Sequence, residues 1–294
     1  MTKEVQNELN KTLTHIFNQK SSVSDIYPLR GGSINDVFFF TFSSRKFVCK
    51  VNSGYKNKVA LPLDFFEIEK KNLDFLRGKS GFKLPEVITV GTINSTQFIC
   101  LEYIDSFESE LNWHRAGLNL ADLHTNTSAE FGLSYDNYMG TVIQKNTTTH
   151  SFIDFFVTHR LNPLVKKCYD NKLVENNNLR QFERFYSSLN SLLPPTKPSL
   201  IHGDLWIGNI ILGISESTLI DPAISFSHPE ADLAMSVLFG AFHPEFYAAY
   251  ESKAILEKNW RERVDYFNLY PNLIHLFLFG ESYKPNIVEV IKKF

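Results

Sequence analysis

The sequence has few cysteines, and their arrangement argues against a disulfide-stabilised extracellular protein. Only three occur among 294 residues, at Cys49, Cys100 and Cys168, and none forms a CxxC motif. An odd number of cysteines also argues against a framework of paired disulfides. We therefore expect the reducing environment of the cytoplasm.

The sequence also lacks an excess of charge of either sign and a long apolar run. Its 30 basic and 32 acidic residues nearly balance, and no basic tract stands out, so nucleic acid is not an expected partner. No apolar stretch approaches the roughly 18 residues of a membrane span. The first eight residues are polar and carry no apolar signal core. We expect no membrane partner either.

Two kinds of pattern follow each other along a chain whose length suits two lobes around a cleft. The first third alternates strand-like and helix-like stretches, at residues 27–52, 86–91 and 96–103 and at residues 4–18 and 63–77. Helical spacing prevails afterwards. We therefore expect an N-lobe over residues 1–104, with a sheet and a helix, and a mainly helical C-lobe over residues 105–294.

A polar loop between two short apolar stretches holds the residues of greatest chemical interest. In Leu200-Ile-His-Gly-Asp-Leu-Trp-Ile-Gly-Asn-Ile-Ile-Leu212 the apolar ends predict buried strands, and residues 202–209 form the loop that joins them. Asp204 and Asn209 lie in this loop, and Asp221 follows at the end of the next apolar stretch. Because strands hold such loops rigidly, we expect these three side chains to lie close together.

Two carboxylates and an amide at this spacing suit phosphoryl transfer. Asp204 would accept the proton of the attacking hydroxyl, while Asn209 and Asp221 would offer the oxygen ligands that Mg²⁺ prefers. Protein kinases carry His-Arg-Asp, four residues and Asn, then Asp-Phe-Gly downstream. Here the Asp–Asn spacing is kept, but the Arg and the Phe-Gly are absent. An Asp and an Asn at this spacing are also common in ordinary loops, and the flanking strands favour the kinase interpretation.

Lys50, on a predicted strand, is the candidate contact for a nucleotide phosphate. A buried ammonium needs an anionic partner. On the predicted helix, Glu69 shares the apolar face and is the candidate partner, with Glu67 in reserve. Kinases pair a strand lysine with a helix glutamate in this way. The alternatives are the exposed face of an edge strand for Lys50 and a solvated helix face for the glutamates.

Two backbone segments would complete a nucleotide site. One is the turn of Gly31, Gly32 and Ser33, whose N–H groups could approach phosphates, although a Gly-Gly pair also makes simple hairpin turns. The other is a hinge whose backbone would meet the adenine, formed by Glu102, Tyr103 and Ile104. The alternative for the hinge is an ordinary strand end.

Longer runs around these residues resemble a known family. His-Gly-Asp, with Asp-x-x in place of Asp-Phe-Gly, is similar to the aminoglycoside and choline phosphotransferases, which phosphorylate small molecules. His202-Gly-Asp-Leu-Trp-Ile-Gly-Asn209, with Asp221-Pro-Ala223 and Ser227-His-Pro-Glu-Ala-Asp-Leu-Ala-Met-Ser-Val-Leu-Phe-Gly240, more closely resembles the fructosamine kinase (ketosamine-3-kinase) family. Asp136-Asn-Tyr-Met-Gly-Thr141 and Arg160-Leu161 fit the same pattern.

The resemblance implies a two-lobed, protein-kinase-like fold of the α+β class with an antiparallel sheet in the N-lobe. It also implies transfer of phosphate from ATP, with Mg²⁺, to the sugar O3 of ketosamines. The phosphorylated product is unstable and releases the free amine. Carried over by position, Asp204 is the base, and Asn209 and Asp221 are the Mg²⁺ ligands. Lys50 contacts the phosphates, with Glu69 as its partner.

Further residues take their expected roles from the same resemblance. Trp206 either contacts the substrate or only packs the loop, and Arg160 either faces the substrate or braces the C-lobe. Asp232 would bind the backbone of the catalytic loop. Many relatives have Cys where Ser33 stands, so we expect no thiol redox switch there. Cys49 should be packed on the face of its strand opposite to the site, and is a poor substitute.

The fold does not fix the acceptor. One alternative is a kinase of an aminoglycoside, choline or an amino sugar. Another is a nucleotide-binding pseudokinase, against which the full set of Lys50, Asp204, Asn209 and Asp221 argues. We expect a monomer acting on a small-molecule or protein-bound ketosamine, and the sequence leaves the preferred ketosamine open.

Overall fold

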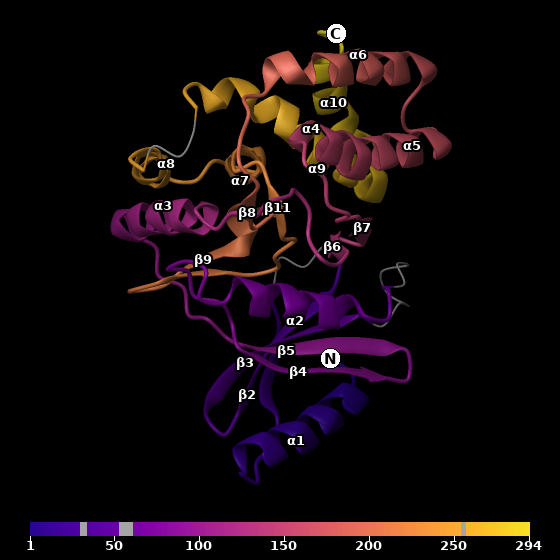
Figure 1. The fold of residues 1–294 in the computed structure, drawn as a ribbon. Coiled ribbons are helices and arrows are strands. Elements are labelled where there is room, and N and C mark those ends of the chain that lie inside the picture. Colours follow the sequence, from indigo (N-terminus) through magenta and orange to yellow (C-terminus); the bar gives the residue numbers. More distant parts are fainter. Residues whose placement is uncertain (30–33, 53–60, 254–256) are drawn as a thin grey trace.

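An antiparallel five-stranded sheet forms the N-terminal part of the protein (Figure 1). The computed structural model describes residues 1–29, 34–52, 61–253 and 257–294, and the strands lie in the order β1-β2-β3-β5-β4. Their bounds are Ser24–Pro28 (β1), Asp36–Phe42 (β2), Arg45–Asn52 (β3), Val87–Ile93 (β4) and Thr96–Glu102 (β5). The strands expected in this part of the sequence are thus confirmed.

Two helices cover opposite faces of this sheet. Helix α1 (Lys3–Phe17) begins where the Thr2 hydroxyl accepts the N–H of Val5, and its apolar side packs on one face together with Cys49 of β3. Helix α2 (Phe65–Leu76) lies on the other face, between the sheet and the rest of the chain (Figure 1). Because side chains alternate along a strand, Cys49 points toward α1 and Lys50 toward α2.

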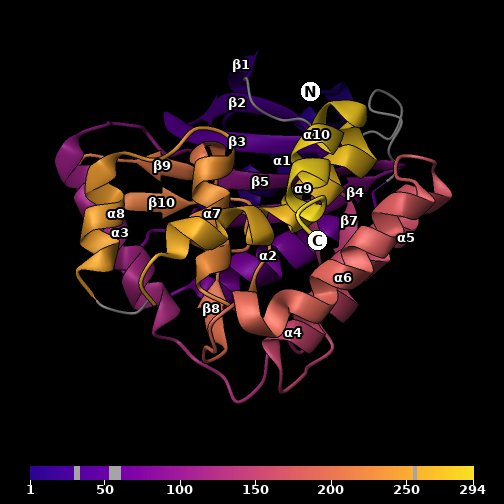
Figure 2. The same cartoon turned by 90° about the horizontal axis from the view of Figure 1, so that it is seen from above.

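The remaining chain is mainly helical. Its α-helices are α3 (Glu110–His124), α4 (Phe152–Phe155), α5 (Asn162–Asp170), α6 (Asn176–Leu192), α7 (Glu230–Leu238), α8 (Pro244–Glu251), α9 (Val264–Phe279) and α10 (Lys284–Ile291). Figure 2 shows α3 beside α8 on one flank and α5 and α6 on the other. Among the described residues, no helix is both long and apolar enough to cross a bilayer.

Short turns of other helix types lie between the helices and strands of this part. A π-helical turn, η1 (Phe156–Leu161), joins α4 to α5, and 3₁₀ turns are formed by η2 (Ile207–Asn209), η3 (Trp260–Arg263) and η4 (Glu281–Tyr283). A buried cluster then packs the last two helices, α9 and α10, against α5 and α6. This cluster makes the end of the molecule that lies far from the sheet (Figure 1).

Three two-stranded ladders lie between the five-stranded sheet and the distal helices. They pair β6 (Asn137–Met139) with β7 (Val142–Gln144), β8 (Ser199–Ile201) with β11 (Ser225–Ser227), and β9 (Ile210–Leu212) with β10 (Ser217–Leu219). Strands β8 and β9 are buried, as expected, and the polar loop of residues 202–209 connects them. The ladders therefore fix both ends of that loop.

A second buried cluster joins the sheet to the helical part. It contains Leu73 of α2, Ile99 of β5, Leu120 of α3, Leu205 of the polar loop and Phe246 of α8. Apolar side chains buried together in this way hold their elements in fixed relative positions. The polar loop is therefore anchored to the same core as the sheet and α2.

Candidate active site

The polar loop brings Asp204 and Asn209 into direct contact. Asn209, at the end of η2, donates its Nδ2 to the Oδ2 of Asp204 and to the backbone carbonyl of Asp204, both at 2.9 Å. Because the amide nitrogen is engaged by Asp204, the Oδ1 of Asn209 is left as the atom that can bind a cation. A carboxylate and an amide oxygen therefore lie side by side on a rigid loop.

The surroundings of Asp204 make its carboxyl more basic than usual. Burial raises the pKa of Asp204 to about 7, the hydrogen bond from Asn209 acts to lower it, and the nearby carboxylate of Asp232 raises it further. A carboxylate with a pKa near neutrality is suited to accept a proton from a hydroxyl. The loop thus provides a candidate general base.

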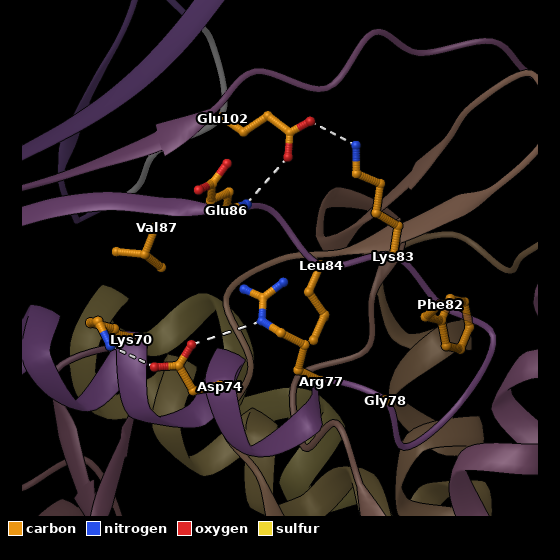
Figure 3. Close-up of a pocket in the computed structure, with 10 residues that line it drawn as sticks. All are labelled: Lys70, Asp74, Arg77, Gly78, Phe82, Lys83, Leu84, Glu86, Val87 and Glu102. Atoms are coloured by element: carbon orange, nitrogen blue, oxygen red, sulfur yellow. Dashed lines mark hydrogen bonds and ion pairs between the residues drawn. The ribbon is translucent and has the colours of Figure 1, made fainter. Parts of the chain in front are cut away.

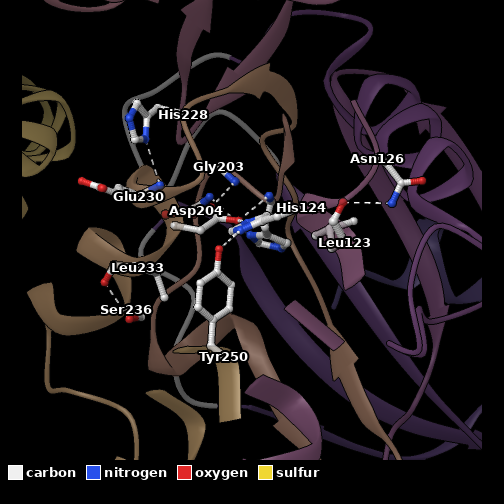
Figure 4. A network of polar contacts seen from close by, with 12 residues as sticks. Leu123, His124, Asn126, Gly203, Asp204, His228, Glu230, Leu233, Ser236 and Tyr250 are labelled. Carbon is white, nitrogen blue, oxygen red and sulfur yellow. Dashed lines mark hydrogen bonds and ion pairs between the residues drawn. The ribbon is translucent and has the colours of Figure 1, made fainter. Parts of the chain in front are cut away.

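Asp232, on α7, binds the backbone of the polar loop through its side chain. It is completely buried, and its two carboxylate oxygens accept the N–H groups of His202 at 2.7 Å and Gly203 at 2.8 Å. The His124 ring lies 3.2 Å from the carboxylate of Asp232. Its other nitrogen lies 2.6 Å from the hydroxyl of Tyr250, a contact that Figure 4 shows. The expected structural role of Asp232 is confirmed, whereas no pattern in the sequence pointed to Tyr250.

Lys50 connects the sheet, α2 and Asp221. Its Nζ lies 2.7 Å from Oε1 of Glu69 and also donates to Oδ1 of Asp221. The ammonium is nearly buried, and each of its two carboxylate partners carries the negative charge that such a group requires. Glu69 rather than Glu67 faces Lys50, and Glu67 is exposed.

Backbone contacts place Asp221 beside the polar loop. The N–H of Ile220 donates to the carbonyl of Asn209 at 3.1 Å. Gly203 has a φ of 83°, and a Cβ there would lie 2.1 Å from the carbonyl oxygen of Ala223, so only glycine allows this approach. Asp204, Asn209 and Asp221, together with Lys50 and Glu69, are therefore gathered at one place between α2 and the ladders.

Comparison with known proteins identifies the family. The sequence profile of the family described as fructosamine kinase matches residues 4–294. The chain belongs to the fructosamine kinase family. A protein of Enterococcus faecium named "Probable ketoamine kinase" is 32% identical over 273 residues, which cover 92% of this chain and 95% of that protein. The crystal structure of a candidate fructosamine-3-kinase from Thermobifida fusca matches with a TM-score of 0.84 and 26% identity, covering 97% of this chain and 98% of that one.

More distant proteins share the fold of this chain. A thermostable mutant of an aminoglycoside phosphotransferase matches with a TM-score of 0.61 at 13% identity, covering 97% of this chain and 98% of that one. At this identity the likeness concerns the fold alone. The protein has the two-lobed, protein-kinase-like fold of the α+β class, and both the resemblance and the fold expected from the sequence are confirmed.

The first residues of the segment expected to be the hinge have partners within the protein. Glu102 donates its N–H to the carbonyl of Glu86 at 2.9 Å, and its carboxylate binds Lys83 at 2.7 Å in a pocket that both side chains line (Figure 3). The N–H of Tyr103 donates to the backbone carbonyl of Lys46 at 3.3 Å. Among these three residues, all within the described part of the chain, Ile104 is the one whose N–H has no backbone acceptor.

The candidate phosphate-binding turn and the candidate substrate residue Trp206 remain to be placed. Gly31, Gly32 and Ser33 lie outside the described residues. Trp206 is half-buried, packs edge-on against Phe239 with ring centroids 5.7 Å apart, and covers Gly208, where a Cβ would lie 2.3 Å from the indole ring. Trp206 is thus held in place by packing and still has an open side.

Arg160 is buried rather than open to a ligand. It is 5% exposed, and its guanidinium donates to the carbonyl of Lys145 at 2.7 Å and to Oδ1 of Asn146 at 2.6 Å. The same group stacks on the ring of Phe155, 4.4 Å from its centroid. Of the two alternatives for Arg160, the contacts favour the one in which it braces the C-lobe.

The sequence did not draw attention to a group of buried amides beside Asp221. They are Asn72, Asn137 and Gln144, and all three are at most 2% exposed. Asparagine and glutamine are usually exposed, and nothing in their spacing marks these three as neighbours. On the helix 63–77, Asn72 lies next to Leu73 of the apolar face, which was the available signal for this member of the group.

Proposed function

We propose that this protein is an ATP-dependent kinase that phosphorylates the sugar O3 of ketosamines. The contact between Asp204 and Asn209, next to Lys50, Glu69 and Asp221, carries the proposal because it unites a base with cation and phosphate ligands. Membership of the fructosamine kinase family supplies the acceptor class. The printed name of the Enterococcus faecium relative, a ketoamine kinase, supports the same acceptor.

In this proposal Asp204 orients the sugar hydroxyl and accepts its proton. A raised pKa makes the carboxylate a stronger base, and the bond from Asn209 fixes its direction. Lys50 offsets negative charge on the phosphates, and Glu69 holds the lysine in place. Because the residues mainly position and stabilise charge, orientation and electrostatics supply most of the rate.

The residues present fit a magnesium ion. The Oδ1 of Asn209 and the carboxylate of Asp221 are hard oxygen donors, and Mg²⁺ is commonly bound by one or two such groups together with nucleotide phosphates. Bound there, Mg²⁺ would neutralise charge on the phosphates. The carboxylate of Asp221 now contacts Lys50, so Lys50 must share this carboxylate with the cation.

We also assign the nucleotide to the N-lobe, residues 1–104, and the catalytic loop, metal ligands and acceptor to the C-lobe, residues 105–294. All strands of the five-stranded sheet end by Glu102, which supports this boundary. The adenine would meet the backbone of Glu102, Tyr103 and Ile104, chiefly the N–H of Ile104. The turn of Gly31, Gly32 and Ser33 would contact the phosphates.

The acceptor would bind on the open side of Trp206. A half-buried ring beside Asp204 offers an apolar face for a sugar or a cationic amine. The three buried, unpaired cysteines support a reducing, cytoplasmic location. We further propose that the protein acts as a monomer on small-molecule or protein-bound ketosamines.

The function can be tested by ATP consumption with Mg²⁺ on fructosyl-lysine, ribulosyl-lysine, aminoglycosides and choline. Turnover with a ketosamine alone, lost in Asp204→Asn, is the expected outcome. Turnover with another acceptor alone would replace the substrate and keep the mechanism. ADP binding without turnover of any acceptor would favour a pseudokinase.

A further inference from the structure

The three backbone carbonyls that follow Asp221 are each bound by a different buried side-chain amide. Pro222 O accepts from Asn72 at 2.8 Å, Ala223 O from Gln144 at 3.1 Å, and Ile224 O from Asn137 at 2.8 Å. The amides come from α2, β7 and β6, respectively. We call Asn72, Asn137 and Gln144 the amide triad.

Contacts within and around the amide triad fix which way each amide points. Asn137 accepts at Oδ1 from Gln144 at 2.9 Å and donates from Nδ2 to Oδ1 of Asn72 at 3.4 Å. The hydroxyl of Tyr270 donates to Oε1 of Gln144 at 2.8 Å, and that of Tyr135 to Oδ1 of Asn72 at 3.1 Å. Because the oxygens accept from these donors, the nitrogens must face the carbonyls of residues 222–224.

The amide triad is also held from the C-lobe. Asn146 donates to Oδ1 of Asn137 at 3.0 Å, and Arg160 donates to Oδ1 of Asn146 at 2.6 Å. A buried amide is unfavourable unless it is hydrogen-bonded, and apolar side chains would fill the same space without that penalty. Because these amides are connected and all hydrogen-bonded, we infer that they serve to orient the backbone they bind, in addition to filling space.

The backbone that the amide triad binds begins at a residue in an uncommon conformation. Asp221 has a φ of 55°, in the left-handed region that residues with a Cβ seldom occupy. Such a conformation persists where the surroundings hold it, and it occurs often at functional sites. The amide triad binds the carbonyls of the next three residues, so it fixes the direction in which the Asp221 side chain leaves the backbone.

Helix α2 connects the amide triad to the lysine. Asn72 follows Glu69 by three positions, so both side chains lie on one face of the helix. Glu69 reaches Lys50 at 2.7 Å, and Asn72 reaches the carbonyl of Pro222 at 2.8 Å. The same helix face thus contacts the phosphate-binding lysine and the segment that carries Asp221.

We propose that the amide triad positions the Asp221 carboxylate for the nucleotide-bound cation. The inference rests on the proposed function, in which Asp221 is a Mg²⁺ ligand. Magnesium requires nearly ideal octahedral geometry. Loosening residues 222–224 should therefore weaken the contribution of Mg²⁺ to nucleotide binding more than it weakens the other nucleotide contacts.

The test is calorimetric titration of the full-length protein with ADP, once with Mg²⁺ and once with EDTA. Asn72→Leu and Gln144→Met remove the donors while keeping side-chain size, and Asn72→Ser is a milder change should Asn72→Leu not fold. Asn178→Leu is the matched control, since Asn178 is a buried amide that caps α6, far from the site (Figure 1). Each variant is also unfolded thermally, to separate stability from binding.

In the amide-triad variants, we expect the gain in ADP affinity from Mg²⁺ to fall about five-fold, with the affinity in EDTA changed less than about two-fold. The control should lose stability and keep the gain. Amide-triad variants that lose stability but keep the full gain in ADP affinity from Mg²⁺ would overturn the positioning role. A wild-type protein whose ADP affinity ignores Mg²⁺ would instead contradict the metal assignment of the proposed function, and the inference with it.

Discussion

His202 and Ala223 are joined by a backbone hydrogen bond of 2.9 Å, from the N–H of Ala223 to the carbonyl of His202. This bond ties the loop that carries the candidate base to the segment that carries Asp221. Asp232 binds the N–H of His202 from the opposite side. The candidate base Asp204 and the candidate cation ligand Asp221 are thus held relative to each other by backbone contacts, and replacing one side chain should leave the other in place.

Replacing Asp204 by Asn should abolish most turnover without disturbing nucleotide binding. The amide keeps the size of the side chain but cannot accept the hydroxyl proton, so kcat on a ketosamine should fall by about 10²–10⁴-fold. ADP affinity with Mg²⁺, measured by calorimetry, should stay within about two-fold. A variant with wild-type turnover would assign proton acceptance to another group.

The activity should depend on the protonation of Asp204. Burial raises the pKa of Asp204 to about 7, and the base works only in its charged form, so kcat/KM should fall as the pH drops through that value. Profiles are measured with saturating ATP, and ADP binding over the same range shows whether the fold is intact. If kcat/KM instead began to fall at a pH well above 7, this would argue against Asp204 as the base.

Lys50 and Glu69 should affect catalysis to different degrees. Lys50→Met removes the charge proposed to face the phosphates and leaves two carboxylates without their cation, so kcat/KM for ATP should fall by about 10²–10³-fold. Glu69→Gln retains an acceptor for the lysine and should cost about ten-fold. Glu67→Gln is the control, because Glu67 is exposed on the same helix. Equal losses in Glu67→Gln and Glu69→Gln would remove the assigned role of the Lys50–Glu69 pair.

Arg160 should matter for stability more than for the choice of acceptor. Arg160→Leu leaves the carbonyl of Lys145 and the Oδ1 of Asn146 without their donor, which should lower the free energy of unfolding by about 2–4 kcal/mol. Thr158→Ala, an exposed change in the same turn, should shift it by less than about 0.5 kcal/mol. Denaturant unfolding gives these values. An altered ratio of activities on fructosyl-lysine and ribulosyl-lysine at unchanged stability would restore Arg160 as a substrate contact.

The sequence predicted the parts of the site whose pattern is local. Asp204 and Asn209 share one short loop. The position of Glu69 on the apolar face of its helix, together with the lysine–glutamate pair of kinases, selected it over Glu67. Contacts between distant segments could not be foreseen in this way. Asn72 and Pro222 are 150 positions apart, and His124 and Tyr250 are 126 apart. Their pairing depends on the packing of α2 and α8, which no local pattern encodes.

The enzyme should resist mild oxidants, because its three thiols are buried. Cys49 and Cys100 face each other across β3 and β5, and burial raises the pKa of both thiols; it raises the pKa of Cys168 to about 11. The thiolate is the reactive form, so these groups should react slowly while the fold is intact. We expect kcat to stay within about two-fold after peroxide treatment, and all three thiols to titrate only in denaturant. Ser33→Cys is the matched variant, since it places a thiol in the glycine-rich turn that is expected to contact the phosphates, and it should gain sensitivity. A loss of activity in the wild type that a thiol reductant restores would show that one of the buried cysteines is accessible and reactive after all.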